Sequence, residues 1–386
     1  MATLAKAAAS DRGTTSPAYD WLAGDLHNHC ERHDLVDEHF SGLDDRLDFV
    51  ALTNHAQKPI FAEQVDMVAR GREMLEIPVF FGLEWNAPEG VHANVIFPPF
   101  QEEAEVAAEF IRQFDRRADL EDNAIEQAFV WLAALPADQR PIVFFNHPFP
   151  GHWADDVIAR YIAADPLGSL VIGIEAVNGH QAGKATDPDE FPGCRPDGSS
   201  DQVYKTGRPF SLLSNSDFHV HKQSRFYDYP MGVFSRSVVG VPQGRRGAAA
   251  IFEGLRAGRT WAILGHWLIP HSFHIGDAGQ GDTALTGKEP TTLHMHFELQ
   301  VPARVDIIGQ LTAQAPAAVL HEYGMQPSGQ TDLNFAIPAH SAGFVRLRVT
   351  AETDQRPPIS PGFNGGGVSG PTTAHSSAIL IADSIP

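Results

Sequence analysis

The stretch Trp21-Leu-Ala-Gly-Asp25-Leu-His27-Asn-His29 joins a short apolar run to a pair of histidines. Four later strand-like runs also end in histidines or acids: Thr53-Asn-His55, Gly82-Leu-Glu84, Asn146-His147-Pro148 and Ser214-Asn-Ser-Asp217-Phe-His219. The ends of barrel strands are where β/α enzymes place catalytic and metal-binding side chains. One such island can arise by chance, but five in this order predict a polynuclear metal site.

Strand-like and helix-like segments alternate over roughly the first 262 residues. Apolar, β-rich runs predict strands over 21–26, 48–53, 78–83, 93–97, 141–145, 170–176 and 210–213. Helical periodicity predicts helices over 61–76, 104–114, 123–135 and 247–261, the last stopped by a turn at Gly258. This repetition predicts an α/β fold with a mostly parallel sheet or barrel.

The pattern changes after residue 262. Short alternating segments separated by Pro and Gly turns predict strands over 291–301, 305–309, 317–323, 332–337, 343–351 and 377–381. Residues 355–375, rich in Pro, Gly, Ser and Thr, are expected to form a long loop. We therefore predict a flexible leader over 1–18, a metallohydrolase barrel over 19–262 and a β-sandwich domain over 263–386.

Composition limits the classes of partner. The chain has 386 residues, 43% of them hydrophobic, so it can bury a large core. Its formal net charge of −20 argues against nucleic acid or an anionic membrane as partner, and a small-molecule ester is the expected substrate. Cys30 and Cys194 are the only cysteines and no apolar stretch reaches the roughly 20 residues of a membrane span, which predicts a cytoplasmic protein. The oligomeric state is left open.

The spacing of the histidines suits metal binding. His27 and His29 are two residues apart on a strand end, so their imidazoles point to the same side, and Asp217 and His219 repeat this spacing. Imidazole and carboxylate together favour Zn, Mn or Fe over Mg and Ca, which prefer oxygen ligands alone. A buried cluster of such groups is unfavourable unless cations neutralise it. A single histidine pair can also consist of two buried side chains that bind no metal and make hydrogen bonds to backbone groups.

The order of the islands resembles the PHP family of metal-dependent hydrolases, named for its polymerase and histidinol phosphatase members. The resemblance covers most of the α/β part of the chain and implies a distorted seven-stranded β/α barrel with two to three divalent transition-metal ions. It implies nine ligands, with Glu84 as the bridge: His27, His29, Asp34, His55, Glu84, His92, His147, Asp217 and His219.

The resemblance also implies how the ligands are shared. One ion is expected to take His27, His29, Glu84 and Asp217, a second Glu84, His92 and His147, and a third Asp34, His55 and His219. The acid in the loop after His29 has three close alternatives in sequence, namely Glu31, His33 and Asp37. Asn54 departs from the family pattern, in which many members have Asp, so affinity at the third site is expected to be weaker.

The expected chemistry is ester hydrolysis by a metal-bridging hydroxide, with Asp217 as proton acceptor and with Lys58 and His180 near the substrate. A phosphate ester is favoured because phosphoester hydrolysis is the commonest activity in the family. Three observations keep a neutral carboxylic or carbamate aryl ester open. Few basic residues lie near the islands, and the C-terminal part resembles that of members grouped with the carbaryl hydrolases. Aromatic residues also crowd the island segments: Trp85, Phe145, Phe149, Trp153, Phe218, Phe226, Tyr227 and Tyr229. A third alternative is a non-catalytic metal-binding accessory module.

Overall fold

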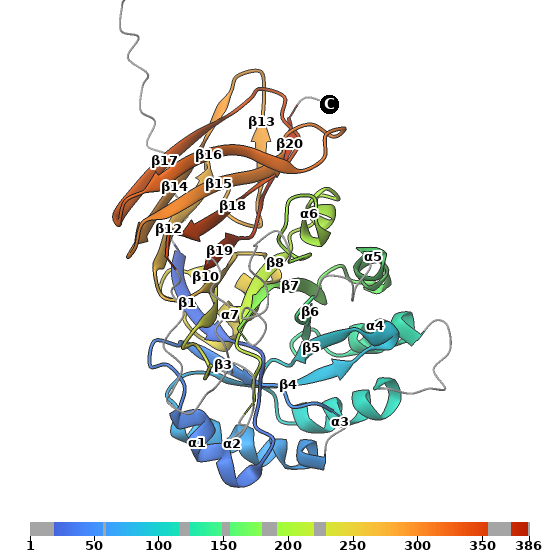
Figure 1. The fold of residues 1–386 in the computed structure, drawn as a ribbon. Helices are drawn as coiled ribbons and strands as arrows, with labels where there is room; N and C mark the ends of the chain where they lie inside the picture. The colour runs from blue at the N-terminus through green and yellow to red at the C-terminus, as the bar shows by residue number, and fades with distance from the viewer. Residues whose placement is uncertain are drawn as a thin grey trace, which may run out of the picture.

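The computed structural model describes residues 19–56, 59–115, 124–148, 155–179, 191–219, 229–353 and 372–384. These residues form a mixed α/β fold with one large sheet, and the β-rich C-terminal part lies beside the α/β part (Figure 1). The α/β class predicted from the alternating pattern is confirmed. The seven-stranded barrel of PHP type and the division into three segments stay predictions.

The α/β part is built on strands that follow the predicted runs closely. They are β1 (Tyr19–Asp25), β3 (Phe49–Leu52), β4 (Val79–Asn86), β5 (His92–Ile96), β6 (Ile142–Phe145), β7 (Val171–Asn178) and β8 (Ser211–Asn215). Strands β1, β3 and β4 pair in parallel, as do β6, β7 and β8, while β5 is antiparallel to both of its neighbours. Parallel pairing therefore predominates among these seven strands, whereas β10 (Ser235–Pro242) runs antiparallel to β1 on its other edge.

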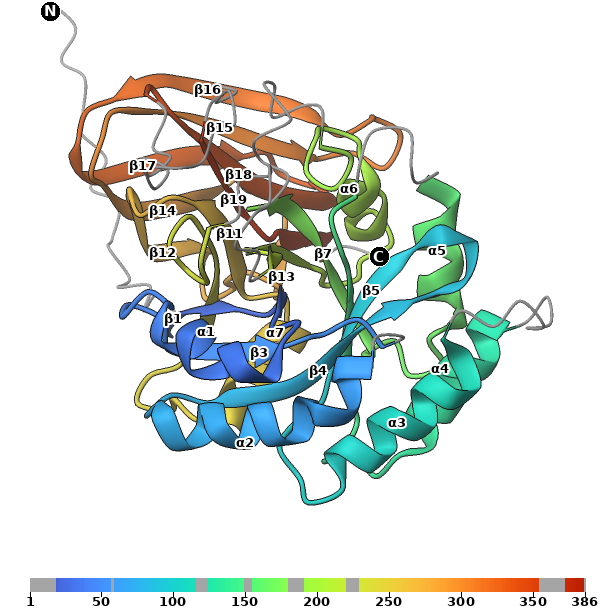
Figure 2. The same cartoon turned by 60° about the horizontal axis from the view of Figure 1, so that its bottom comes forward.

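The helices lie on the outside of this part (Figure 2). They are η1 (His33–Leu35), α1 (Val36–Ser41), η2 (Pro59–Glu63), α2 (Gln64–Met74), η3 (Pro88–Gly90), α3 (Glu103–Phe114), α4 (Ala124–Ala134), α5 (Asp155–Ala164), α6 (Ser199–Tyr204) and α7 (Ala248–Arg256). Among these described helices, none combines the length and the apolar character that a membrane span requires.

The sheet of the α/β part curves back on itself. One buried apolar cluster receives side chains from β1, β3, β4, β5, β6, β7 and β8, and also from β10 (Ser235–Pro242) and α7. No hydrogen-bonded ladder between the described parts of β8 and β10 is seen; the Ser237 hydroxyl instead spans them. Its Oγ accepts a hydrogen bond from Ser214 N–H (3.0 Å) and lies 3.1 Å from the Ser214 carbonyl oxygen. The Ser237 side chain thus links β8 and β10 along the line where the sheet meets itself, which is called the seam below.

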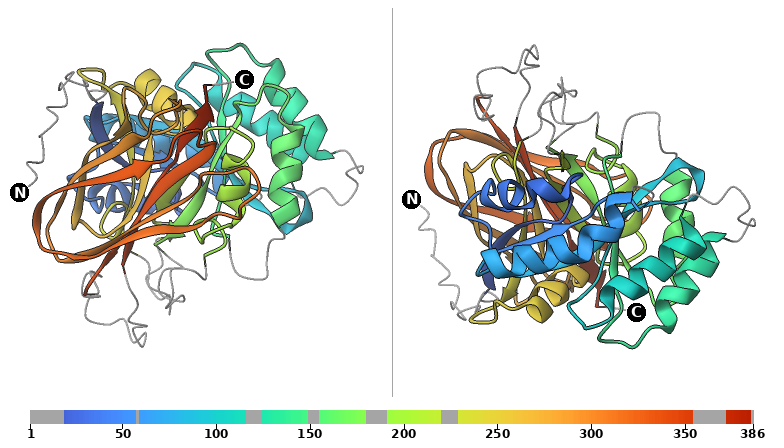
Figure 3. Two further views of the ribbon diagram at one scale, coloured as in Figure 1. Left: turned by 90° about the horizontal axis from the view of Figure 1, so that it is seen from above. Right: turned by 90° about the horizontal axis from the view of Figure 1, so that it is seen from below.

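The C-terminal part is made of strands in two sheets. The three-stranded sheet contains β12 (Leu268–Ile275), β14 (Thr291–Leu299) and β17 (Gly329–Ile337). The large sheet contains the others: β11 (Thr260–Leu264), β13 (Thr283–Thr286), β15 (Ala303–Gln310), β16 (Ala318–Gln326), β18 (Gly343–Ala351), β19 (Thr373–Ser376) and β20 (Ile379–Asp383). In both views of Figure 3 the orange strands of this part lie on the side away from the teal helices α3 and α4.

Several elements differ from the sequence-based expectation, and three of these differences concern the large sheet. The helix predicted over 247–261 ends at Arg256 because Gly258 adopts a left-handed backbone (φ +71°), and β11 begins at Thr260. The end of the loop predicted over 355–375 is strand β19. Strand β10 was not predicted, since its serines and glycine weaken the strand pattern. These differences matter together, because β11 pairs with β10 on one side and β19 on the other, and so carries the large sheet across residue 262.

Candidate metal centre

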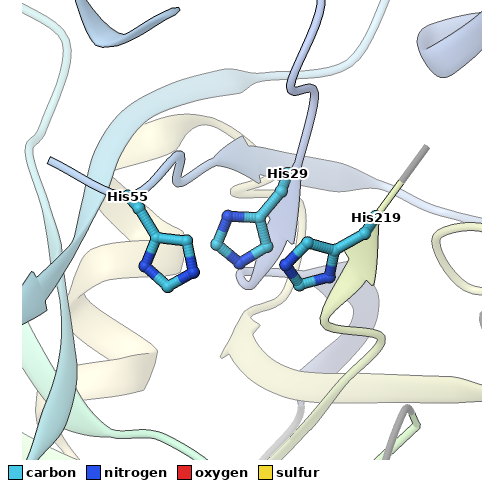
Figure 4. A group of neighbouring side chains, drawn as sticks. All are labelled: His29, His55 and His219. Atoms are coloured by element: carbon cyan, nitrogen blue, oxygen red, sulfur yellow. The ribbon is translucent and has the colours of Figure 1, made fainter. Parts of the chain in front are cut away.

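The candidate centre begins where two very short strands meet. Strand β2 (Asn28–His29) pairs in parallel with β9 (Phe218–His219), which places His29 opposite His219. Their rings stack with centroids 4.1 Å apart, and the ring of His55 lies 4.7 Å from that of His29 on the other side. Figure 4 shows these three imidazoles side by side. Segments that lie nearly two hundred positions apart in the sequence therefore meet, as the five islands predicted.

Glu84, on β4, lies at the centre of the histidines. It is almost completely buried, and its Oε1 accepts a 3.1 Å hydrogen bond from Asn146 Nδ2 and another, also 3.1 Å, from His147 Nε2. Each nearby imidazole places a ring nitrogen within 3.5 Å of one of its carboxylate oxygens: His27 at 3.5 Å, His29 at 3.3 Å, His55 and His92 at 3.0 Å, and His147 at 3.1 Å. The strands on both sides of β4 supply these side chains, so the carboxylate is in the position that a bridging ligand requires.

Asp217 is the second carboxylate of the cluster. Its Oδ1 lies 3.3 Å from Nε2 of both His27 and His29. The backbone of Asp217 is left-handed (φ +52°), as is that of His147 (φ +30°), a conformation that costs free energy in residues with a side chain. Two positions of the same cluster are therefore held in strained backbone by the surrounding structure.

Burial and charge act in opposite directions on these groups. Burial raises the pKa of Glu84, but the imidazoles of His27 and His55 more than offset it and hold that pKa well below its usual value. Burial lowers the pKa of His27, but Asp217, Glu175 and Glu84 hold it well above the usual value. The pKa of His29 lies well below its usual value because of burial and the nearby His219. A proton on His27 therefore supplies the positive charge that the carboxylates require.

The hydrogen-bonding state of the imidazoles tests whether a metal fits here. Among the described residues, His27 Nε2, both ring nitrogens of His29, and His92 Nδ1 are buried without a hydrogen-bond partner. Buried polar atoms normally have partners. Nitrogens left without one, beside carboxylates and with the ligand types that suit Zn, Mn or Fe, fit a divalent transition metal. Cations would displace the proton from His27 and satisfy these atoms.

The structure gathers three groups whose ligand atoms lie within 4.8 Å of one another. They are His29 with His55 and His219, His27 with His29 and Asp217, and His27 with Glu84 and His147. His92 adjoins the last group through its contact with Glu84. The cluster thus contains eight predicted ligands: His27, His29, His55, Glu84, His92, His147, Asp217 and His219.

Asp34 is not brought into these groups, and its place in the expected ligand set stays a prediction. Its side chain is 64% exposed and forms an ion pair with Arg32. Together with His33 and Asp37, two of the alternatives for this position, it lines a separate surface cavity of about 610 Å³ beside α2. The reason is the short helix η1, which turns this loop outward after His29. Lys58 and His180, the predicted substrate contacts, lie outside the described residues.

Asn54 contributes to the centre through the backbone. Its Oδ1 accepts a hydrogen bond from Cys30 N–H (2.8 Å), and its Nδ2 faces the Met67 sulfur at 3.9 Å. The Asn54 amide therefore holds the backbone next to His29 in place. An aspartate at this position would put a carboxylate oxygen against the Met67 thioether. The expected weaker metal affinity at the third site stays a prediction.

One residue beside the cluster was not singled out from the sequence. Glu175 is fully buried on β7, and its Oε1 lies 3.1 Å from His27 Nδ1. Its signal in the sequence is an acid within an otherwise apolar strand run, Val171-Ile-Gly-Ile-Glu175-Ala-Val. Burial of such a group requires partners, so a charged residue there points to a polar site on that face.

Comparisons with known proteins leave the family open. No protein-family model matches the sequence, and no curated protein matches it. One solved structure with a match is a candidate metal-dependent phosphoesterase from Bifidobacterium adolescentis, 14% identical, covering 50% of this chain and 86% of that one at a TM-score of 0.28. Another is the C-terminal domain of Wzt, 15% identical, covering 32% and 78% at a TM-score of 0.21. At these scores neither likeness contributes to the assignment below.

Proposed function

We propose that this protein is a metal-dependent hydrolase of small ester substrates. The observation that carries the proposal is the position of Glu84, a buried carboxylate with imidazole nitrogens within 3.5 Å from several strands. Such a cluster requires cations or protons to compensate its charge. Its exposed side is formed by His92 and His147, whose side chains are partly accessible, so a small molecule can reach it.

The proposed ligand sets follow the three groups. His27, His29, Glu84 and Asp217 would hold one ion, and Glu84, His92 and His147 a neighbouring one, with Glu84 between them. His55 and His219 would contribute to a third ion, whose affinity is expected to be lowest because Asp34 does not complete the set. Divalent transition ions in such a site activate water for attack and polarise the ester group of the substrate.

The side chains of the protein have two further tasks in this proposal. The buried imidazoles and carboxylates orient the reacting groups. Strand β4 and the short β2–β9 pair hold these side chains in position before the substrate binds. Asp217 would accept the proton that the attacking water releases, because its carboxylate lies 3.3 Å from His27 and His29 of the proposed ligand set. No serine or cysteine nucleophile is needed.

A phosphate ester is the proposed substrate class. Three of the aromatic residues that kept an aryl ester open are core residues: Trp85 and Phe145 are fully buried, and Tyr229 is 7% exposed. Trp85 donates to the Phe114 carbonyl oxygen (2.9 Å), away from the histidines. The described aromatic residues thus give less support to an apolar aryl pocket than the sequence pattern did.

Purified protein reconstituted with Mn²⁺ or Zn²⁺ provides the test. The substrates are 4-nitrophenyl phosphate, bis(4-nitrophenyl) phosphate, 4-nitrophenyl acetate and 1-naphthyl methylcarbamate. The proposal expects turnover of a phosphate ester that chelator abolishes and metal restores, and loss of both metal and turnover in Glu84→Gln. Turnover of only 4-nitrophenyl acetate and 1-naphthyl methylcarbamate would contradict the phosphoesterase assignment and indicate an esterase for neutral esters. Full metal occupancy without any turnover would favour the accessory module.

A further inference from the structure

We infer that Glu175 is a positioning residue that fixes His27 and His147 for metal binding. This inference rests on the proposed metal centre and extends it to a residue outside the ligand set. Glu175 is fully buried, and its carboxylate reaches both histidines from β7. The hydrogen bonds that it makes within the described residues come from the His27 ring, two side-chain amides and a backbone N–H, so the site requires an acceptor at both oxygens.

The two carboxylate oxygens serve different histidines. Oε1 accepts hydrogen bonds from His27 Nδ1–H (3.1 Å) and Asn215 Nδ2 (2.9 Å). Oε2 accepts them from the His147 backbone N–H (2.7 Å) and Asn178 Nδ2 (2.9 Å). On the first side Glu175 keeps the proton on Nδ1, which leaves His27 Nε2 free to bind metal next to Glu84 and Asp217. On the second side it holds the strained backbone of His147 in place.

The local strand geometry directs Glu175 to this position. The pairing of β7 with β8 shifts register between Glu175 and Val177, so the extra residue forms a bulge next to the cluster. Glu175 itself precedes the bulge and pairs with Leu213, whose side chain lies in the apolar cluster enclosed by the sheet. Paired residues of neighbouring strands point to the same face, so the carboxylate of Glu175 points to the enclosed side, where His27 and His147 lie.

In Glu175→Gln, the amide NH₂ group would face another N–H donor, and neither would have an acceptor. Asn215 is fixed in orientation because its Oδ1 accepts from Leu26 N–H (2.9 Å), so its amide nitrogen must face Glu175. On the other side, the His147 backbone N–H cannot reverse. An amide nitrogen placed at either oxygen position meets one of these donors, so Glu175→Gln must displace either the His27 side or the His147 side.

The test measures Zn²⁺ affinity by chelator competition and the visible spectrum of the Co²⁺-loaded protein. Glu175→Gln is expected to weaken Zn²⁺ binding about 10- to 100-fold and to alter the Co²⁺ spectrum, which reports ligand geometry. The matched control is Glu103→Gln, which also removes a buried carboxylate, one paired with Arg72 at 2.7 Å on α3 outside the cluster. This control is expected to lower the melting temperature with Zn²⁺ affinity and Co²⁺ spectrum unchanged.

The possible outcomes separate the two levels of the proposal. Wild-type affinity in Glu175→Gln, or an equal loss in both variants, overturns the positioning role while the metal centre stands. A wild-type protein that binds neither Zn²⁺ nor Co²⁺ overturns the proposed function, and the positioning role with it. If Glu175→Gln does not fold, Glu175→Asp replaces it, since its shorter side chain cannot reach both histidines; unchanged Zn²⁺ affinity in that variant also overturns the inference.

Discussion

At the scale of single residues, the cluster concentrates titratable groups that would be unstable alone. Glu84 and Asp217 are buried beside imidazoles that compensate their charge, and His27 keeps a raised pKa as a result. Other histidines nearby have the opposite environment. His39 donates from Nε2 to Asn28 Oδ1 (3.0 Å), and burial lowers its pKa to about 3. One site thus contains histidines that favour different protonation states.

The role proposed for Asp217 predicts separate effects on activity and on metal content. Asp217→Asn keeps an oxygen near His27 and His29 but removes the proton acceptor. We expect turnover of the phosphate ester to fall by about 10²-fold or more, with a much smaller fall in bound metal. Steady-state kinetics and elemental analysis of the same preparation measure both. A parallel loss of metal and turnover would contradict the role as base.

His39 predicts a pH dependence of stability. Its pKa is about 3 in the folded protein against an ordinary 6.5, so below pH 6.5 the unfolded chain takes up a proton that the folded protein does not. The free energy of unfolding should therefore fall as the pH decreases from 6.5 toward 3, by up to about 1.4 kcal/mol per pH unit from this group. His39→Gln, which keeps an N–H donor, should lose less stability between pH 7 and pH 5 in urea titrations. A wild-type-minus-variant difference that does not change with pH would contradict this.

The sequence located most of the candidate site because each ligand follows an apolar strand run. Strand ends can be recognised from composition, and the curvature of the sheet then brings His27, His55, Glu84 and His147 together. Asp34 could not be placed in the same way, since spacing alone does not tell whether a short loop turns inward or outward. Glu175 lies within a strand, and the sequence does not show that His27 and His147 pack against that position.

At the scale of elements, the seam between β8 and β10 depends on side chains. Ser237 Oγ is within hydrogen-bonding distance of the Ser214 backbone and, at 3.0 Å, of Asn215 Oδ1. The strands before the seam were predictable from their apolar runs. Strand β10 was not, because the serines that make these hydrogen bonds interrupt its hydrophobic pattern, so the feature that closes the sheet also concealed the strand.

Removing the hydroxyl of Ser237 tests this closure. Ser237→Ala leaves the Ser214 N–H buried without its acceptor, which should lower the free energy of unfolding by about 1–3 kcal/mol. Ser41→Ala, which removes an exposed hydroxyl on α1, is the control and should change stability little. Denaturant unfolding of both variants measures the difference. Equal stability of Ser237→Ala and the wild type would show that the seam does not depend on this side chain.

At the scale of the whole molecule, a buried ion pair joins the C-terminal strands to the α/β part. Arg346, on β18, donates from Nε to Asp201 on α6 at 2.7 Å, and both side chains are fully buried. The Arg346 guanidinium also donates to the carbonyl oxygen of Cys194 at 2.8 Å. The sequence could not predict that Arg346 contacts Asp201. The two residues are far apart in the chain, and no sequence pattern relates β18 to α6.

Breaking this pair predicts a large loss of stability. Arg346→Met leaves Asp201 buried without its cation, which should cost about 3–5 kcal/mol. The double variant Arg346→Met with Asp201→Leu removes both charges and should recover much of that loss. Thermal and denaturant unfolding measure the set. A double variant no more stable than the single one would indicate that packing, and not the uncompensated charge, causes the loss.

The pairing of β11 with β19 has a consequence for how the protein can be divided. Trp261, Ala262 and Ile263 are hydrogen-bonded along Ser376, His375 and Ala374, and all three are almost completely buried. A polypeptide that ends after residue 264, because of a protease or a premature stop codon, would leave β11 as an exposed apolar edge strand. Such an edge can pair with other copies of the same chain. Such a fragment should therefore aggregate, so the C-terminal strands are required to keep the α/β part folded and dispersed.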